Sequence, residues 1–454
     1  MAERRFDVAI VGGGPAGQAA ALALAPHGLS VTVVDEQPQP GGQILRQPPP
    51  GVAAGNWLPG RSYAGLKRQL ARFAALPDVT WLGGRSVIGI ADDTLYMHGA
   101  DGAETVVATR ILLAAGCQDL AVPLPGWTLP GVYTAGGIQT LLKSQHVLAG
   151  ERILFAGTHP LQLVVAEQVL QAGGSVAGVL FAQPRRAMIA PLLRAPSAAA
   201  RRLIDLLAGG SAFRALRRAG VPVRFGVGVS ALTGDDAVKA AQTTVGTIAC
   251  DAVGLCYGFV PQSALPRLAG AAMLPAGPAG GWRAVHDEWM RSSVDGLYVA
   301  GETVGVAGAA AASAGGSIAG IGIARDLGHV TPDQAERAAA SARKQLADQR
   351  RFAAILDAIA DPRGYLPEPA QDTLVCRCED VPYATIADAV ATGASANAVK
   401  LATRCGMGLC QGRNCEPTLL RLIEAARGPG DPGYTSRFPC LLYTSPSPRD
   451  TPCY

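Results

Sequence analysis

The sequence predicts an α/β fold that is organised in two or three domains. Its 454 residues exceed the roughly 250–300 residues over which a single hydrophobic core grows, so more than one domain is expected. A glycine-rich loop at 12–17 lies between a strand-like and a helix-like segment, and a second strand–loop–helix segment begins near residue 151. Five of the ten cysteines fall between 376 and 415, which sets a C-terminal region apart.

The composition excludes several classes of protein. Hydrophobic residues make up 49% of the chain and charged residues 16%, which excludes wholesale disorder. The net charge of +4 arises from 39 Lys+Arg against 35 Asp+Glu, without a basic stripe, so no nucleic-acid partner is expected. Ten cysteines in so long a chain do not suggest a secreted disulfide scaffold. We expect a cytoplasmic protein.

The first glycine loop has the pattern of a Rossmann-like dinucleotide site. It follows an apolar strand at 6–11 and opens an Ala/Leu-rich helix, and a second strand follows at 31–34. The first glycine permits a tight turn, the second lets a pyrophosphate approach the backbone, and the third lets helix and strand pack closely. The anion then lies at the helix N-terminus, where unpaired backbone N–H groups point toward it. The candidate binding residues are Gly12, Gly14, Pro15, Ala16 and Gly17.

Two carboxylates end the second strand. An acid at this position hydrogen-bonds a ribose 2′-OH and favours an unphosphorylated ribose. The spacing from Gly17 favours Glu36 over Asp35, although strand alternation makes this only a preference.

The second strand–loop–helix unit has an altered loop. Gly157 remains, but His159 stands where a glycine would allow a pyrophosphate to approach, and Gln162 replaces the packing glycine. The following helix and strand are retained, so this domain is expected to fold. Whether it binds NAD(P), another nucleotide or nothing stays open.

The C-terminal cysteines have the spacing of a metal site. Cys376 and Cys378 are separated by one residue, and Cys410 and Cys415 follow with four residues between them. Four thiolates suit a [2Fe–2S] cluster or zinc; the tight first pair and the glycines at 406–412 favour iron–sulfur. Cys117, Cys250, Cys256 and Cys405 are interpreted as ordinary thiols. No Cys-x-x-Cys dithiol occurs in residues 1–370.

Three further segments resemble the two-dinucleotide-domain flavoproteins of the thioredoxin- and glutathione-reductase class. They are the Pro40-Gly-Gly-Gln43 turn, the strand ending at Gly116 and the LYVAGE segment at 297–302. The resemblance implies FAD, with contacts from Gly41, Gly42, Gln43, Gly116, Gly301 and Glu302. In that class the last position is an aspartate that hydrogen-bonds the ribityl chain of FAD; here it is Glu302, which is one methylene longer.

Residues 303–324 contain no charge and are long enough to span a bilayer. Their Gly, Ala and Ser content argues against lipid insertion. The flavoprotein resemblance instead implies a closely packed helix beside FAD. No transmembrane segment is therefore expected, and peripheral membrane association is left open.

The cysteine segment resembles the bacterioferritin-associated-ferredoxin-like (BFD-like) [2Fe–2S] domain. This resemblance implies that the cluster ligands are Cys376, Cys378, Cys410 and Cys415. Cys405 falls outside that pattern.

Over about residues 5–435, the chain resembles the α subunits of amine dehydrogenase complexes, such as opine oxidases, proline and hydroxyproline dehydrogenases and hydrogen cyanide synthase. The stretch VPLPGWTLPGV at 122–132 is especially similar. The resemblance implies that the partner is an FAD-containing, amine-oxidising β subunit; a small ferredoxin-like subunit is a further candidate. This chain would then relay electrons through its flavin and cluster, with no catalytic residue assigned. The alternatives are a stand-alone NAD(P)H oxidoreductase and a non-enzymatic redox sensor or assembly module.

These segments define the predicted domains. The FAD-binding domain comprises 1–150 and 258–328, and the NAD(P)-binding-like domain 151–257. A helical linker at 329–371 leads to the [2Fe–2S] domain at 372–430. Residues 440–454 resemble translated cloning sequence and are excluded from the functional interpretation.

Overall fold

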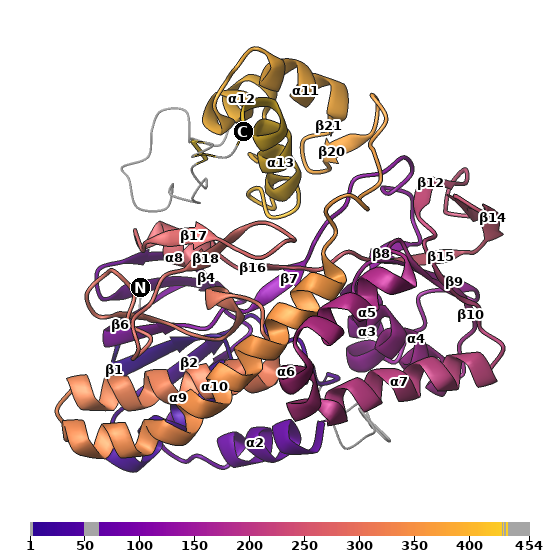
Figure 1. The fold of residues 1–454 in the computed structure, drawn as a ribbon. Coiled ribbons are helices and arrows are strands. Elements are labelled where there is room, and N and C mark those ends of the chain that lie inside the picture. Colours follow the sequence, from indigo (N-terminus) through magenta and orange to yellow (C-terminus); the bar gives the residue numbers. More distant parts are fainter. Residues whose placement is uncertain (1–2, 50–62, 429, 431–432, 435–454) are drawn as a thin grey trace.

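The chain folds into two sheet-based lobes, with a small helical domain placed over the junction between them (Figure 1). The computed structural model describes residues 3–49, 63–428, 430 and 433–434. The chain enters the first lobe, crosses to the second, and returns to the first before it reaches the C-terminal domain.

The first lobe is built on a seven-stranded sheet of order β3-β2-β1-β6-β5-β4, with β19 paired to β6. Strands β3, β2, β1, β6 and β19 are parallel, and β4 and β5 form an antiparallel extension. Val8, Ala9 and Ile10 are fully buried, as in a parallel strand covered on both faces. The strands are β1 (Glu3–Val11), β2 (Val31–Asp35), β3 (Val79–Gly83), β4 (Ser86–Ala91), β5 (Thr94–Gly99), β6 (Gly102–Leu113) and β19 (Leu297–Val299).

Helices cover this sheet in successive layers. α1 (Pro15–Leu24) lies against α9 (Ala309–Asp326). α10 (Pro332–Ala360) lies on α9 (Figure 1). A Cβ on Gly316 would overlap the carbonyl oxygen of Ala16, so glycine is required where the two helices touch. Other elements of this lobe are η1 (Ala25–His27), α2 (Ala64–Ala74), α8 (Ala264–Leu268), β17 (Met273–Pro275), β18 (Trp282–Ala284) and η4 (Gly301–Val304).

The second lobe has a five-stranded parallel sheet of order β11-β10-β9-β15-β8. Its strands are β8 (Val132–Thr134), β9 (Ile153–Gly157), β10 (Val176–Phe181), β11 (Val223–Phe225) and β15 (Ala252–Cys256). Its helices are α3 (Ala135–Thr140), the π-helix η3 (Leu141–Gln145), α4 (Leu161–Gln171), α5 (Arg185–Arg194), α6 (Pro196–Arg201) and α7 (Leu203–Arg218). A small antiparallel sheet adds β12 (Val229–Thr233), β13 (Ala240–Thr243) and β14 (Gly246–Ala249).

Two antiparallel strands connect the lobes: β7 (Cys117–Asp119) leads out, and β16 (Phe259–Pro261) leads back. The return lies next to the predicted boundary at 257/258. On the outward side, β8 pairs with β15 in the second sheet and precedes the predicted boundary at 150. Sequence patterns placed this boundary at the next glycine loop, whereas β8 and α3 precede that loop.

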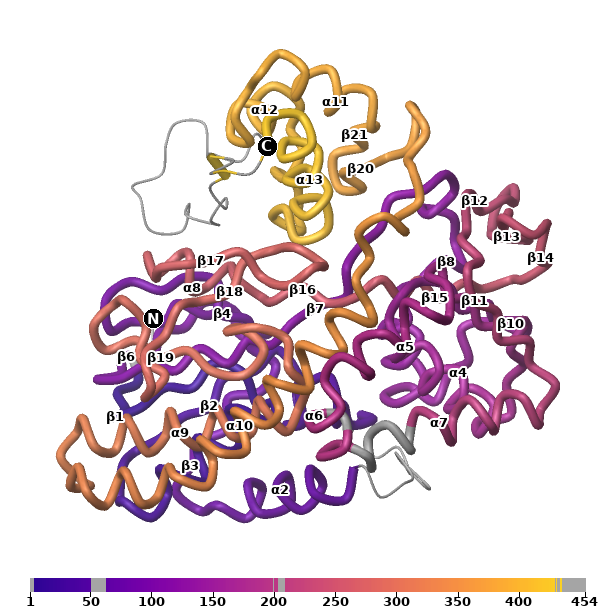
Figure 2. Tube along the Cα trace, viewed as in Figure 1, coloured from indigo at the N-terminus to yellow at the C-terminus, as the bar shows by residue number. Residues whose placement is uncertain are grey.

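The C-terminal domain has its own small core. It contains β20 (Leu374–Cys376), β21 (Val381–Pro382), α11 (Tyr383–Ala391), α12 (Ala396–Thr403) and α13 (Glu416–Arg427). The tube in Figure 2 shows how α10 and the extended segment after it lead from the first lobe to this domain.

The uncharged stretch at 303–324 comprises the end of η4 and most of α9, which contribute to the core of the first lobe. Within the described residues, no helix is both long enough and apolar enough to cross a membrane. The tail predicted to be non-native, 440–454, lies outside the described residues.

Candidate functional site

The first glycine loop has the close contacts that its pattern predicts. Gly12 has φ +108°, and a Cβ there would overlap the carbonyl oxygen of Ala114. A Cβ on Gly17 would overlap the carbonyl oxygen of Gly12, where α1 meets its strand. A Cβ on Gly14 would have no neighbour closer than the Cα of Gly42, at 3.6 Å. The loop therefore combines tight packing inside with an approachable backbone at Gly14.

Two helices begin at this loop region. α1 starts at Pro15 and α9 at Ala309, and neither has a side-chain cap at its N-terminus. Gly301 precedes α9 and lies against Ala16, because a Cβ on Gly301 would be 2.9 Å from the Ala16 Cβ. Unpaired N–H groups and the positive end of a helix dipole favour a negatively charged ligand. The geometry fits the pyrophosphate of a dinucleotide.

Asp35, rather than Glu36, lies against the glycine loop. The Asp35 carboxylate accepts hydrogen bonds from Gly13 N at 2.6 Å and from Gln37 N at 2.7 Å. Burial raises the pKa of the Asp35 carboxyl above its usual value. Glu36 directly follows the strand and is exposed. The Asp35 side chain therefore has the direction that a contact with the loop requires, whereas the ribose contact expected of Glu36 stays a prediction.

The Pro-Gly-Gly-Gln turn lies beside this loop. Gly41 N donates to Gly13 O at 2.9 Å, and a Cβ on Gly42 would be only 2.7 Å from the Cα of Gly14. The exposed Gln43 is held through its backbone, because Lys143 Nζ donates to its carbonyl oxygen at 2.8 Å. The turn thus forms one wall of the candidate FAD site. Sequence reasoning missed Lys143, which lies in a π-helix of the other lobe.

The structure places Gly116 and Glu302 close together. Gly116 N donates to Thr303 Oγ1 at 3.2 Å. The Glu302 carboxylate accepts from Cys117 Sγ at 2.8 Å and from Gly308 N at 3.2 Å. Burial raises the pKa of the Cys117 thiol, so the thiol keeps its proton and acts as the donor.

A pocket beside this group is lined by Met290, Glu302, Gly305, Gly308, Ala311 and Arg350. Cys117 was interpreted from the sequence as an ordinary thiol. Its position at the start of the strand that crosses between the lobes, directly after Gly116, was the only available signal.

The second glycine loop is closed by the chain itself. Thr158 Oγ1 donates to the carbonyl oxygen of Ala360 at 2.7 Å. Gln183 Nε2 donates to Thr158 O at 2.6 Å and to Ile359 O at 2.9 Å. Ile359 and Ala360 are the last residues of α10, so the end of that helix covers the loop on which a nucleotide would lie.

The residues expected to recognise a nucleotide are also replaced in this lobe. Phe181 pairs with Gly157 and therefore takes the place that Asp35 has beside Gly12; it is fully buried and stacks on Phe225. His159 Nδ1 accepts from Leu161 N at 3.1 Å, and its ring meets Phe259 edge-on. Burial lowers the pKa of His159 to about 4, so the imidazole is neutral at pH 7. The loop carries neither an acid for ribose nor a cation for phosphate.

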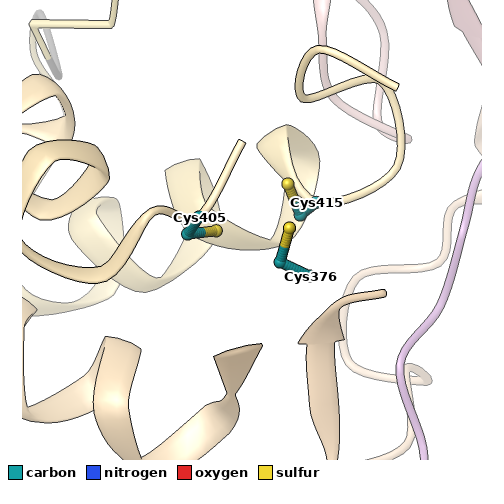
Figure 3. Close-up of side chains that lie close together, drawn as sticks. All are labelled: Cys376, Cys405 and Cys415. Carbon is teal, nitrogen blue, oxygen red and sulfur yellow. The ribbon is translucent and has the colours of Figure 1, made fainter. Parts of the chain in front are cut away.

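The C-terminal cysteines come together on the ends of three elements (Figure 3). Cys376 ends β20, Cys405 follows α12, and Cys415 immediately precedes α13. Their sulfur atoms all lie within 4.8 Å of one another. The thiols of Cys405 and Cys415 donate to Cys376 and lower its pKa well below the usual thiol range. In the described part of the chain, this is the group of Cys, His or acidic residues that could hold a metal.

The other two expected ligands form the outer side of this site. Cys378 is exposed and Cys410 is half-buried, and their thiols interact with each other. Gly408 allows the two segments to meet, because a Cβ there would overlap the Cβ of Cys378. The set of thiols at the positive end of α13 fits an iron–sulfur cluster. The structure brings all four expected ligands to one region and adds Cys405, which the sequence interpretation had left out.

The iron–sulfur domain is attached to the strands that cross between the lobes. Gln118 Nε2 donates to the carbonyl oxygen of Arg413 at 2.6 Å, and Gln262 Nε2 donates to Gln118 Oε1 at 2.8 Å. Arg413 lies between Cys410 and Cys415, whereas Gln118 directly follows Cys117. The loop that carries two expected cluster ligands therefore contacts the strand that borders the candidate FAD site.

A second set of contacts holds the same interface. Arg267 forms an ion pair with Glu416 at 2.9 Å, and both side chains are nearly buried. Trp282 Nε1 donates to the same carboxylate at 2.7 Å, and Trp127 Nε1 donates to Leu374 O at 2.7 Å. Sequence patterns gave no signal for these contacts, because each joins residues far apart in the chain.

Known proteins match both parts of the chain. The family model "Pyridine nucleotide-disulphide oxidoreductase" matches residues 6–342, and the "BFD-like [2Fe-2S] binding domain" matches residues 374–425. An opine oxidase subunit from Rhizobium meliloti (strain 1021) is 32% identical over 444 residues, which covers 96% of each chain. Hydrogen cyanide synthase subunit HcnB of Pseudomonas protegens is 32% identical over 448 residues, which covers 95% of this chain and 94% of the relative.

Solved structures share the fold at lower identity. L-proline dehydrogenase from P. horikoshii aligns with a TM-score of 0.68 at 19% identity, covering 95% of this chain and 76% of that one. T. acidophilum thioredoxin reductase aligns with a TM-score of 0.52 at 22% identity, covering 71% of this chain and 99% of that one.

These matches confirm the α/β flavoprotein fold, the C-terminal iron–sulfur domain and the resemblance to opine oxidase and hydrogen cyanide synthase subunits. FAD and a [2Fe–2S] cluster are the cofactors that the two domains imply, and the chain is an FAD-dependent oxidoreductase. The chain belongs to the pyridine nucleotide-disulphide oxidoreductase family and adds a BFD-like [2Fe-2S] binding domain to it.

Proposed function

We propose that this chain is the electron-relaying subunit of an amine or amino-acid dehydrogenase complex. An FAD-containing β subunit would oxidise the C–N bond of an opine, proline or hydroxyproline-type substrate, and this chain would pass the electrons to an acceptor. A small ferredoxin-like subunit is a further candidate partner. The names of the relatives, which are subunits of opine oxidase and of hydrogen cyanide synthase, support a partner subunit.

The observation that carries this proposal is the contact between Gln118 and Arg413. It attaches the loop of two proposed cluster ligands, Cys410 and Cys415, to the strand that begins beside Gly116 and Glu302. The ion pair between Arg267 and Glu416 holds the same interface. Two redox centres held next to one strand suit transfer of electrons within a single chain.

The roles of this chain's own residues follow from the site. FAD, when bound, supplies the redox chemistry that links a two-electron donor to a one-electron acceptor. We assign the pyrophosphate to the backbone at Gly14, Pro15 and Ala16 and at the start of α9, and the ribose to Asp35. Gly41, Gly42 and Gln43 form the wall beside this loop, and Gly116, Gly301 and Glu302 lie next to the N-terminus of α9. The proposed ligands of the cluster are Cys376, Cys378, Cys410 and Cys415.

The alternative of a stand-alone NAD(P)H oxidoreductase has less support. It requires a second nucleotide site, but the end of α10 is hydrogen-bonded to that loop through Thr158 and Gln183. The buried Phe181 takes the place of a ribose acid. Electrons are therefore expected to enter from a partner and not from a nicotinamide nucleotide.

Electron transfer within the chain is the first test. The flavin of the purified chain is reduced anaerobically by light with a deazaflavin, and cluster reduction is followed by EPR and stopped-flow absorption. We expect Gln118→Leu to slow cluster reduction several-fold at unchanged FAD and iron content, because it removes the contact with Arg413. Gln171→Leu, on the exposed face of α4, is the matched control and should leave the rate unchanged.

The identity of the electron donor distinguishes the relay from the NAD(P)H oxidoreductase. In the presence of the β subunit, amine substrate should reduce both centres, whereas the chain alone should leave the amine unchanged. Rapid bleaching of the flavin by micromolar NADH, or robust amine oxidation by the chain alone, would contradict the relay. A cluster that changes partner binding without turning over any acceptor would favour a sensor.

A further inference from the structure

The cluster site contains one thiol more than a [2Fe–2S] cluster uses. Cys405 is fully buried and lies with Cys376 and Cys415, from which its sulfur is separated by no more than 4.8 Å (Figure 3). The four proposed ligands do not include it. A fully buried thiol in the middle of a metal site is not explained by the ligand pattern of the family.

The spacing of this thiol suits direct bonding to iron. Two thiolates on one tetrahedral metal, with metal–sulfur bonds of about 2.3 Å, lie about 3.8 Å apart. The sulfur–sulfur distances among Cys376, Cys405 and Cys415 exceed that value by no more than about 1 Å. A small side-chain adjustment therefore brings Cys405 into bonding range of an iron held by either neighbour.

The backbone around Cys405 permits such an adjustment. Arg404, with φ +65°, ends α12, and Gly406 has φ +81°. A Cβ at Gly406 would make ordinary van der Waals contacts at 3.7–3.8 Å, so the backbone there is packed without being compressed. Cys410 lies in the same loop, which contains further glycines at 408 and 412. Cys405 and Cys410 thus belong to one loop, whereas Cys376 ends β20 and Cys415 directly precedes α13.

The proposed ligands differ in their exposure to solvent. Cys376 and Cys415 are buried, whereas Cys378 is exposed and Cys410 is half-buried. Exposed thiolates are oxidised first, and a cluster that loses a ligand loses iron unless another donor is in reach. The site is therefore most vulnerable on its outer side.

We propose that Cys405 is a reserve ligand that replaces Cys410 on the cluster when the Cys410 thiolate is lost. The step is a ligand substitution without electron transfer: the Cys410 sulfur–iron bond breaks, the Cys405 thiol releases its proton to water, and its sulfur bonds to the same iron. The proposal rests on the presence of the cluster and not on the relay. Its test measures iron, so failure of the relay and failure of the reserve ligand are distinguishable.

The test compares three variants of the full chain, purified anaerobically. Iron and acid-labile sulfide per FAD are measured, together with the EPR spectrum of the dithionite-reduced protein. We expect Cys405→Ala to keep the wild-type iron content and spectrum. Cys410→Ala should keep at least half of the iron but show shifted g values, and the double variant Cys405→Ala/Cys410→Ala should retain less than a tenth.

Two results would overturn the proposal. One is a Cys410→Ala protein that is as poor in iron as the double variant, which would mean that Cys405 does not take over. The other is loss of the cluster from Cys405→Ala alone, which would make Cys405 a primary ligand. FAD content and elution volume report folding, and Cys250→Ala, a buried thiol of the second lobe, serves as the control for loss of a core thiol.

Discussion

At the end of β2, two neighbouring carboxylates differ in what they can reach. The Asp35 side chain points to the glycine loop and bonds Gly13 N, whereas Glu36 is exposed. Side chains of a strand alternate between its two faces, so a one-residue difference reverses the direction. The spacing from Gly17 was therefore insufficient to choose between them.

This difference can be measured as FAD affinity. A hydrogen bond to a charged group contributes about 1.5–3 kcal/mol, so Asp35→Asn should raise the dissociation constant of FAD by roughly 10- to 100-fold. Glu36→Gln, the matched control, should bind FAD as the wild type does. The measurement is a fluorescence titration of apoprotein with FAD. If Glu36→Gln raised the dissociation constant of FAD more than Asp35→Asn does, the ribose contact would belong to Glu36.

Cysteines also show what residue spacing leaves open. The pairs at 376/378 and 410/415 have a recognisable spacing, and the structure brings them to one region. Cys405 and Cys117 have no such spacing, yet one lies inside the cluster site and the other bonds Glu302. Their surroundings depend on which elements pack together, and covalent spacing does not report that.

At the scale of elements, the small residues of α9 are explained by its contact with α1. Gly316 and Gly320 lie over the backbone of Ala16 and Ala20. This close approach brings the N-termini of both helices to the glycine loop. The closely packed helix that the flavoprotein resemblance implied is thus present in this segment.

The contact predicts an unusual response to alanine. In a helix interior, Gly→Ala normally stabilises by about 0.5–1 kcal/mol. Gly316→Ala should instead destabilise by about 1–3 kcal/mol and reduce FAD content, because its Cβ overlaps the Ala16 carbonyl. Gly210→Ala in α7, where a Cβ meets nothing within 4 Å, is the control and should stabilise. Thermal unfolding of both variants measures this; a more stable Gly316→Ala protein would contradict the close contact.

The second glycine loop shows which contacts between elements could not be predicted from the sequence. His159 and Gln162 indicated an impaired loop from the sequence alone. That the end of α10 lies on this loop could not be predicted, because Thr158 and Ala360 are 202 residues apart. The element that closes the site is thus a helix interpreted from the sequence only as a linker.

At the scale of the whole molecule, Lys143 joins the two lobes. Its ammonium donates to the carbonyl oxygens of Gln43 at 2.8 Å and Ile44 at 3.3 Å, and to Gln139 Oε1 at 2.9 Å. Burial, with a smaller contribution from Arg46, lowers the pKa of Lys143 to about 7. The residue is thus an interlobe contact with a proton that is easily lost.

This contact predicts a pH dependence of stability. In the unfolded chain the lysine has a pKa of about 10.4, so between pH 7 and pH 10 the unfolded state holds a proton that the folded state releases. The free energy of unfolding should therefore rise with pH in this window, by up to about 1.4 kcal/mol per pH unit from this group. Below pH 7 both states are protonated, and the contribution no longer changes.

The difference between variants isolates this group. Lys143→Met should remove this increase in the free energy of unfolding. From pH 7 to pH 9.5, the melting temperature of the wild type should therefore rise relative to that of the variant. Lys344→Met, at an exposed position of α10, is the control and should parallel the wild type. Parallel curves for Lys143→Met and wild type would show that this lysine does not lose its proton in that range.

The sequence by itself determined the features that depend on local spacing. These are the two strand–loop–helix units, the glycines that a tight loop requires, the paired cysteines and the family resemblance. Such features are encoded within a few tens of residues, because they follow from backbone conformation and from the reach of adjacent side chains.

The tertiary structure decided which of these features meet. It placed Asp35 on the loop, the end of α10 on the second nucleotide site, Cys405 among the cluster thiols, and Gln118 against Arg413, 295 residues away. Each of these contacts depends on how whole elements pack against one another. That packing minimises buried, unpaired polar groups and empty space across the entire chain, which a local pattern does not record.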